Sequence, residues 1–547
     1  MIRRLFSKKI DSITLAATLV AFSSLASRFL GIFRDRILAG EFGAGNILDV
    51  YYAAFRVPDL IFNLLVMGAL SAGFIPTLTC LIKDSKCNEF FSFRKSPNKE
   101  AWYLVNNILN LLLLVLIGVS VLGIVFAPGL VKLIAPGFSP EKQSLTAELT
   151  RIMFLSPIFL GISSILGGIL QSFKRFFVYS LSPIMYNLGI IAGALYLVPW
   201  LGIYGLAWGV ALGAFLHMMI QLPMVWRLGY RYRPIINFAS GNLRKIARLM
   251  IPRTMTLAIS QINLLVITIF ASTLATGSLS VFNFANNLQS FPIGIFGISF
   301  AIAAFPSMSQ LARDKNKLIA NLSATVRKVL FFMVPATVLL LTLRAQIVRV
   351  ILGTGQFGWT DTVLTLETLS FFSISLFAQA LVPLLNRAFY AQQTARTPFF
   401  IGLFAAFVNV VSVWYFSRIM GVAGLALGFS LANIVNFMFL WLALHLRLGD
   451  LEEGKVLVSA VKFSLAAVAC GVMVQASKIT IAPLVNMTKF WGVLTQGLIA
   501  GILGFLVYLA VCFVLRSEEL LSIWGTFSRR LPWKKVQTGD QGEARGI

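Results

Sequence analysis

Long apolar runs separated by short polar stretches make up most of this chain. A helix that crosses a bilayer needs about 20 largely apolar residues, and the sequence holds fourteen runs of this kind. They lie at residues 13–38, 47–82, 103–128, 151–172, 178–198, 203–226, 246–274, 279–305, 328–352, 363–386, 397–417, 422–446, 456–477 and 490–515. The pattern predicts an all-α polytopic membrane protein with about 14 transmembrane helices. The second run is too long for one straight span, and we expect a bend or an interfacial entry at Pro58.

The amino-acid composition agrees with this prediction and limits the kinds of partner that we expect. Hydrophobic residues make up 58% of the chain and charged residues 12%, about half the fraction usual in soluble proteins. A net charge of +26 is typical of nucleic-acid binding in a soluble protein. Here the basic residues lie in short clusters between apolar runs, so we expect contact with membrane lipids and not with nucleic acid.

The residue types that enzymes and metal sites need are scarce. The four cysteines form no C-x-x-C pair, which predicts neither a zinc site nor a disulfide framework. The two histidines, His217 and His445, lie far apart in apolar runs, where we expect them to be packed or hydrogen-bonded. No phosphate-binding G-x-x-x-x-G-K-[ST] loop is present. We therefore expect no enzyme activity, no metal and no cofactor.

Lysine and arginine are distributed asymmetrically between alternate loops. Four, five, six, five and six of them lie in residues 1–10, 83–102, 227–248, 311–328 and 516–547. The loops 39–46, 199–202, 275–278, 353–362 and 479–488 contain none. The positive-inside rule then predicts a multi-pass membrane protein with both termini in the cytoplasm. The first run resembles a signal peptide, but its cleavage would remove a helix that the internal repeat requires.

The two halves of the chain are weakly similar to each other. Residues 37–45 resemble residues 269–277, and the Phe-Ile-Pro at 74–76 matches the Ala-Phe-Pro at 304–306. We expect two six-helix lobes in a pseudo-two-fold repeat, two extra transmembrane helices and a basic cytoplasmic tail, at residues 1–228, 229–447, 448–516 and 517–547. Duplicated halves with a site between them are typical of transporters.

Ionisable residues inside apolar spans are costly, so each is a candidate for function. The first two spans hold four arginines and three aspartates: Arg28, Arg34, Asp35, Arg36, Asp49, Arg56 and Asp59. Asp49 and Arg56 are seven residues apart and share a helix face, so we expect them to pair. The charges indicate either salt bridges that hold two helices together, or a cationic cavity whose guanidinium groups bind phosphate. The residues alone leave both interpretations open.

The second half offers different chemistry. Its spans at 246–306 and 397–446 contain no Asp or Glu, so a cation site built from several carboxylates lacks ligands there. The polar residues of this half are candidates for interhelical hydrogen bonds or for a secondary part of the cavity. They include Arg253, Asn283, Asn286, Asn287 and Arg387.

Several strings of this sequence resemble one known family. They are Ser-Arg-Phe-Leu-Gly-Ile-Phe-Arg-Asp at 27–35, Phe-Gly-Ala-Gly at 42–45 and Asp-Val-Tyr-Tyr-Ala-Ala-Phe-Arg-Val-Pro at 49–58, with further matches at 251–253, 284–297 and 387–398. These strings identify the chain as similar to the MurJ/MviN family of lipid II flippases, within the multidrug/oligosaccharidyl-lipid/polysaccharide exporter superfamily. The resemblance covers about residues 13–446.

The resemblance implies a location in the bacterial plasma (inner) membrane and a function in cell-wall (peptidoglycan) biogenesis and cell shape. A member of this family exports an undecaprenyl-diphosphate-linked precursor, lipid II, from the cytoplasmic to the outer leaflet by alternating access. The family's cationic cavity carries over to Arg28, Arg34 and Arg56, with Asp49 at its acidic position and Asp35 nearby. The implied partners are the lipid-linked diphosphate glycan, membrane lipids and other cell-wall synthesis proteins. The two extra helices are expected to offer the polyprenyl tail an apolar groove.

The sequence departs from the family pattern at positions that usually carry charge. Phe62, Asn63 and Met67 replace a basic pair and an acid, Asn287 replaces an arginine, and Ile267 stands where an acid is common. These losses keep two alternatives open: export of another polyprenyl-diphosphate glycan, or a non-transporting membrane scaffold. A drug–cation antiporter is weaker, because it would need buried carboxylates in its cavity.

Overall fold

The computed structural model describes residues 13–67, 74–83, 97–239 and 241–522, and within these ranges it contains helices and no strand. The first part comprises α2 (Ile13–Phe42), α3 (Asn46–Phe62), η1 (Asn63–Met67), α4 (Ile75–Lys83), α5 (Pro97–Val125), α6 (Ala127–Ile134), α7 (Pro140–Met153), α8 (Leu155–Ser172), α9 (Phe176–Ala192), η4 (Gly193–Leu197), α10 (Val198–Leu201), α11 (Tyr204–Met219) and α12 (Leu222–Arg227). The second part comprises α13 (Gly241–Ser272), α14 (Ser278–Pro292), η5 (Ile293–Ile298), α15 (Ser299–Gln310), α16 (Lys315–Thr342), α17 (Arg344–Ile351), α18 (Trp359–Ile374), α19 (Leu376–Ala391), α20 (Arg396–Met420), α21 (Val422–Leu448), α22 (Glu453–Ile481), η6 (Ala482–Leu484) and α23 (Phe490–Val514).

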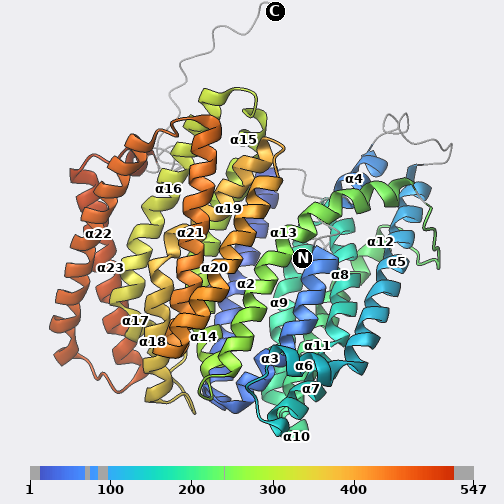
Figure 1. Ribbon diagram of the computed structural model, residues 1–547, viewed down its shortest axis with the longest axis horizontal. Coiled ribbons are helices and arrows are strands. Elements are labelled where there is room, and N and C mark those ends of the chain that lie inside the picture. The colour runs from blue at the N-terminus through green and yellow to red at the C-terminus, as the bar shows by residue number, and fades with distance from the viewer. Residues whose placement is uncertain (1–12, 68–73, 84–96, 240, 523–547) are drawn as a thin grey trace, which may run out of the picture.

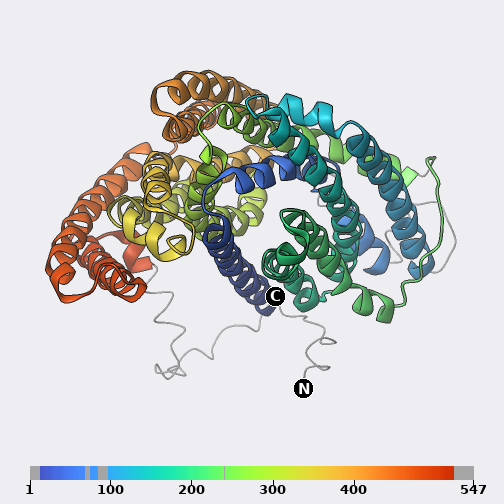
Figure 2. The ribbon, with the colours of Figure 1, turned by 90° about the horizontal axis from the view of Figure 1, so that it is seen from below.

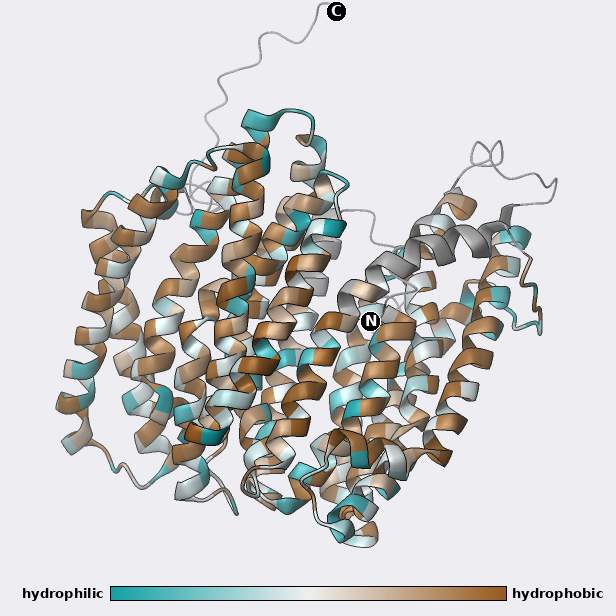
Figure 3. Ribbon diagram, in the orientation of Figure 1, coloured by the Kyte–Doolittle hydropathy of each residue, from teal (hydrophilic) through white to brown (hydrophobic). Residues whose placement is uncertain are grey.

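These helices have the length and hydropathy of membrane spans. Ten segments of the described chain can cross a membrane, or eleven if α18 and α19, which meet at a 46° bend, form one span. Hydrophobic residues follow the helices along their length, while hydrophilic residues gather toward the turns (Figure 3). The expected all-α polytopic class is confirmed, and the protein is a multi-pass membrane protein. The count of fourteen stays a prediction, because α2, α3 and α13 are not among the segments that qualify.

The helices form two groups that lie side by side (Figures 1 and 2). Helices α3 to α12 make up one group, α14 to α23 make up the other, and α2 and α13 pass between them. The last pair, α22 and α23, packs at the far edge of the second group. There the Tyr508 hydroxyl of α23 donates a hydrogen bond to the Phe331 carbonyl of α16, at 2.7 Å.

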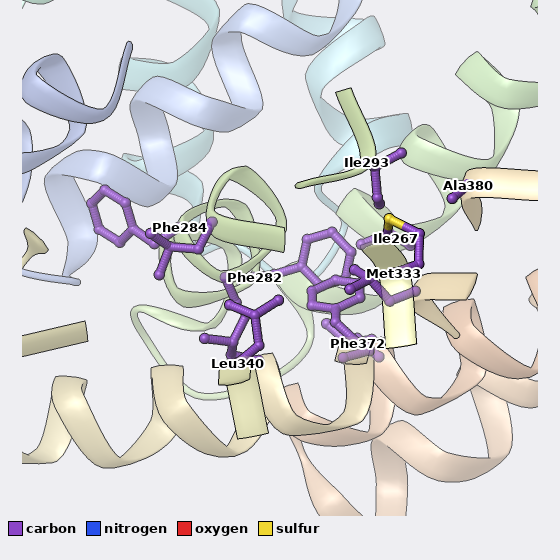
Figure 4. Close-up of a cluster of buried hydrophobic side chains, with 14 of the residues drawn as sticks. Ile267, Phe282, Phe284, Ile293, Met333, Leu340, Phe372 and Ala380 are labelled. Atoms are coloured by element: carbon purple, nitrogen blue, oxygen red, sulfur yellow. The ribbon is translucent and has the colours of Figure 1, made fainter. Parts of the chain in front are cut away.

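Close packing holds each group together. In the first group, glycines of α9 and α11 face each other, and a Cβ on Gly189 would lie 2.3 Å from the Gly213 Cα. Small residues at such a crossing let two membrane helices approach closely. In the second group, aromatic side chains fill the centre, where the Phe282 and Phe372 rings meet edge to face at 5.1 Å (Figure 4).

Some local features differ from the sequence predictions. Pro58 lies inside α3, and helical regularity changes only after Phe62, where the chain becomes π-helical. The stretch 129–150, which lies between the apolar runs 103–128 and 151–172, forms most of α6 and the first part of α7. Cys80 is disulfide-bonded, a bond that the spacing of the cysteines did not predict.

Both histidines are hydrogen-bonded, as expected. His217 Nδ1 lies 2.6 Å from the Ser163 hydroxyl, and His445 Nδ1 lies 2.9 Å from the Glu453 carboxylate. Within the described residues, no group of three or more His, Cys, Asp or Glu side chains could hold a metal ion.

Candidate functional site

The two groups of helices meet backbone to backbone at one end, the lower end in Figure 1. We call this contact the lobe junction, formed by residues 40–49, 272–280 and 354–361. The Gln356 amide donates to the Gly40 carbonyl at 2.8 Å. A Cβ on Gly355 would lie 2.1 Å from that same oxygen, and one on Gly277 would lie 2.1 Å from the Ala44 carbonyl. Both glycines have positive φ, of 55° and 90°, so the contact depends on residues that lack a Cβ.

Asp49 closes the junction by capping α14 of the opposite group. Its carboxylate accepts the Gly277 amide at 2.8 Å, the Ser280 amide at 3.0 Å and the Ser280 hydroxyl at 2.8 Å. It also pairs with the Lys142 ammonium of α7 at 3.2 Å. A carboxylate at this position satisfies N–H groups that have no partner inside the helix and interacts favourably with the helix dipole.

This arrangement overturns the expected pairing of Asp49 with Arg56. Both Asp49 oxygens already have partners, and Arg56 points to other helices. Its Nε donates to the Thr268 hydroxyl of α13 at 2.9 Å, and its Nη2 donates to the Asn283 side-chain oxygen of α14 at 3.3 Å. Arg56 is therefore buried, and its hydrogen bonds link α3 to α13 and α14. The neighbouring Asp59 interacts electrostatically with Arg56 and accepts a hydrogen bond from the Asn63 amide at 3.0 Å.

Arg34 lies on α2 in an ion pair with its neighbour. Its Nη2 lies 2.8 Å from the Asp35 carboxylate, and its Nη1 donates to the Asn187 side chain of α9 at 3.2 Å. The second Asp35 oxygen accepts the Asn287 amide of α14 at 2.8 Å. Asp35 is 3% exposed, whereas the Arg34 side chain keeps 21% of its surface accessible. The pair thus joins α2 to both groups and leaves part of the Arg34 side chain accessible.

Arg28 lies two turns earlier on α2 and forms no ion pair with any described residue. Its Nη1 donates weakly to the Ser290 carbonyl of α14, at 3.4 Å. The guanidinium rests against Gly294, where a Cβ would come within 2.2 Å of the Arg28 Cζ. Of the three arginines expected at the site, Arg28 is the one whose charge has no nearby carboxylate.

Tyrosines and a lysine that the sequence pattern does not single out belong to the same cluster. Tyr51, Tyr52 and Tyr186 all interact electrostatically with Arg34. The buried Tyr52 hydroxyl has no hydrogen-bond partner in the described part of the chain. Tyr51 and Tyr52 could have been found from the sequence, because they lie about one helical turn before Arg56. Lys142 lies between two predicted spans, and only the fold brings it to Asp49.

The remaining candidates lie around this cluster or beyond it. Asn286 accepts a hydrogen bond from Gln289 at 3.0 Å, and Arg387 is half-buried on α19. Ile267 is fully buried in the hydrophobic core, and Phe62 is partly buried. The Arg253 and Met67 side chains lie outside the described residues.

Arg36 belongs elsewhere in the fold. Its guanidinium donates to the Val350 and Ile351 carbonyls of α17 and lies 5.0 Å from the ring centroid of Phe490, at the start of α23. Without Arg36, the cluster holds four cations (Arg28, Arg34, Arg56 and Lys142) against three carboxylates (Asp35, Asp49 and Asp59), an excess of one positive charge. The cluster is therefore cationic as a whole.

Comparisons with known proteins agree with the sequence resemblance. The family described as "Lipid II flippase MurJ" matches residues 38–495. The "Probable lipid II flippase MurJ" of Buchnera aphidicola subsp. Schizaphis graminum is 31% identical over 439 residues, which cover 78% of this chain and 82% of that protein. The protein of the same name from Thermotoga maritima is 29% identical over 514 residues, 93% of this chain and 98% of that one.

A solved structure has the same fold. "Lipid II flippase MurJ, inward closed conformation" superposes with a TM-score of 0.72 and 24% identity, covering 94% of this chain and 100% of that one. The family match spans most of the chain, and the relatives align over most of their own length. The family expected from the sequence is confirmed: this chain belongs to the lipid II flippase MurJ family, a family of transporters and not of enzymes.

Proposed function

We propose that this protein moves lipid II, the undecaprenyl-diphosphate-linked peptidoglycan precursor, from the cytoplasmic to the outer leaflet of the inner membrane. The observation that carries the proposal is Arg28, a cation inside a membrane helix with no carboxylate partner in the described chain. Arg28 is half-buried, and a charge that is partly removed from water without a counterion is costly. A bound diphosphate would supply that counterion, and guanidinium groups bind phosphate oxygens through paired hydrogen bonds.

The three arginines take different parts in this proposal. Arg28 and Arg34 make the first contact with the diphosphate, because Arg28 is unpaired and Arg34 is partly accessible. Arg56 stays bound to Thr268 and Asn283 while the lobe junction is closed. Once α13 and α14 move away from α3, its guanidinium becomes available to the substrate. This order of contacts, first with Arg28 and Arg34 and then with Arg56, would move the diphosphate from α2 toward the lobe junction.

Alternating access follows from the same contacts. We infer that the lobes at residues 1–228 and 229–447 rock against each other, and that the junction opens when Asp49 releases Gly277 and Ser280. The Lys/Arg asymmetry supports an orientation with both termini in the cytoplasm. The junction then lies on the outer side, and the described conformation is closed to the outside. The helices at residues 448–516 would hold the polyprenyl tail.

Complementation tests the proposal. Cells depleted of their own lipid II flippase should regain growth when this chain is expressed, and externally added lipid II hydrolase should again find substrate in the outer leaflet. Arg28→Ala should abolish both effects at normal protein abundance. Arg28→Lys keeps the charge without the planar fork and should impair them. As a control, Arg418→Ala removes an exposed arginine of α20 that stacks on Trp414 and should have no effect.

Export of another polyprenyl-diphosphate glycan is the second candidate. Asp35 meets a neutral amide at Asn287, so this edge of the cluster carries less positive charge than the family pattern implies. Normal abundance without restored growth, together with Arg28-dependent export of a different glycan, would favour this candidate. Normal export by Arg28→Ala, Arg34→Ala and Arg56→Ala variants would instead show that the arginines are structural.

A further inference from the structure

The segment that joins the two lobes is held along α5 by asparagines. Residues 230–237, which we call the strap, run without helical structure from α12 toward α13. Three buried side chains of α5 face it: Asn106, Asn107 and Asn110. Asn107 binds the strap with both ends of its amide. Its oxygen accepts the Asn237 N–H at 2.6 Å, and its nitrogen donates to the Asn237 carbonyl at 3.0 Å.

Asn106 pairs with the strap in the same manner, and Asn110 donates two further hydrogen bonds to it. The Asn106 oxygen accepts the Arg233 N–H at 2.9 Å, and its nitrogen donates to the Arg231 carbonyl at 3.2 Å. Asn110 donates to the Arg233 and Ile235 carbonyls at 2.8 and 3.0 Å. A side-chain amide offers the same donor and acceptor as a peptide group, so α5 satisfies the strap much as a neighbouring strand would. These hydrogen bonds therefore hold the strap backbone in a fixed position against α5.

The pinned backbone presents arginine and aromatic side chains outward. Arg231 and Arg233 are exposed, and neither guanidinium has a hydrogen bond or an ion pair within the described residues. Around them lie Trp226, Tyr232 and Phe238, which are 61%, 58% and 70% exposed. The sequence contains no Asp or Glu between Glu148 and Asp314, so no acid near in sequence offsets this charge.

We propose that the strap is a docking site for anionic phospholipid headgroups, whose phosphates bind Arg231 and Arg233 while the aromatic rings lie at headgroup depth. Cations beside aromatic side chains at the ends of membrane helices are typical of the lipid interface. The strap lies at the outer edge of the first group, on the side away from the lobe junction (Figures 1 and 2). This site is separate from the arginines of α2 and α3, and the proposal does not depend on the transported substrate.

A local lipid-selectivity measurement tests this proposal on the full-length protein in bilayers. Ala239 is exposed at the end of the strap. Ala239→Cys, with the other cysteines replaced by serine, can carry a fluorescent label that brominated lipids quench. Quenching by brominated phosphatidylglycerol is compared with quenching by brominated phosphatidylcholine, and the ratio of association constants gives the local preference.

The protein should prefer phosphatidylglycerol at low salt, by about fivefold for each arginine. The preference should fall as salt rises, because the Debye length shrinks from about 30 Å at 0.01 M to about 8 Å at 0.15 M. The double variant Arg231→Gln/Arg233→Gln should bring the ratio close to one. Arg418→Gln, an exposed arginine on α20, should leave it unchanged.

The geometry of the strap has its own test. Asn107→Ala keeps every charge but removes two of the hydrogen bonds that pin the backbone. It should lower the lipid preference in protein whose thermal unfolding shows that it is folded. An unchanged preference in this variant would show that net charge suffices without the pinned strap. An unchanged preference in the double arginine variant would overturn the proposal and point to a protein partner or to no partner.

Discussion

The Asp49→Asn substitution should shift the protein from a closed to an open lobe junction. The aspartate carboxylate accepts three hydrogen bonds from Gly277 and Ser280 and pairs with Lys142. An asparagine keeps one acceptor oxygen, but it turns an N–H₂ group toward donors and leaves the lysine without its counterion. The three hydrogen bonds cross from α3 to the start of α14, whereas the Lys142 pair lies within the first group, so the loss of the hydrogen bonds falls on the closed state.

The magnitude follows from the type of contact. Hydrogen bonds to a charged group contribute about 1.5–3 kcal/mol each. A net loss of about 3 kcal/mol is a conservative value, since the asparagine retains part of the network. It corresponds to a change of roughly 100-fold in the equilibrium between closed and open states.

Electron-electron distance measurements can detect this shift. Ile47 on α3 and Trp359 on α18 are both exposed and lie at the junction end of opposite groups. Spin labels there should give one short distance in the parent protein and a dominant longer distance in Asp49→Asn. Glu148→Gln is the matched control, because Glu148 bonds Tyr204 within a single group. Equal distance distributions in parent and Asp49→Asn, or an equal shift in Glu148→Gln, would refute the reasoning.

Three further outcomes are expected. Gly277→Ala should also open the junction, because its Cβ would meet a backbone carbonyl 2.1 Å away. Gly229→Ala is the control, since Gly229 has the same φ of 90° and a Cβ there would meet nothing within 4 Å. Equal spin-label distances in the two variants would contradict this prediction. Cysteines replacing the exposed Trp200 and Trp359 should react with an impermeant reagent from outside, and one replacing Phe238 only after permeabilisation; reversed labelling would overturn the proposed orientation. Transport should follow the membrane potential, which is worth about 2.3 kcal/mol per charge at 100 mV. Sodium-dependent transport at fixed potential would contradict this expectation.

The local sequence pattern is sufficient to predict the helices and to single out most of the candidate site residues. Hydropathy depends on consecutive residues, so the apolar runs predict the helices. Buried charge is rare in membrane helices, and for that reason the sequence alone distinguishes Arg28, Arg34 and Asp49 as candidates. The shared signature strings identify the family. None of these inferences requires knowledge of which helices touch.

The partners of those charges are decided only by the tertiary structure. Spacing along one helix predicts that Asp49 pairs with Arg56, but a carboxylate binds whatever donors the fold brings closest. Those donors are the first amides of α14 and the Lys142 ammonium, more than 90 residues away along the chain. Arg56 instead meets Thr268 and Asn283. Helix periodicity describes only which residues share a face, whereas the packing of helices from both halves decides what that face meets.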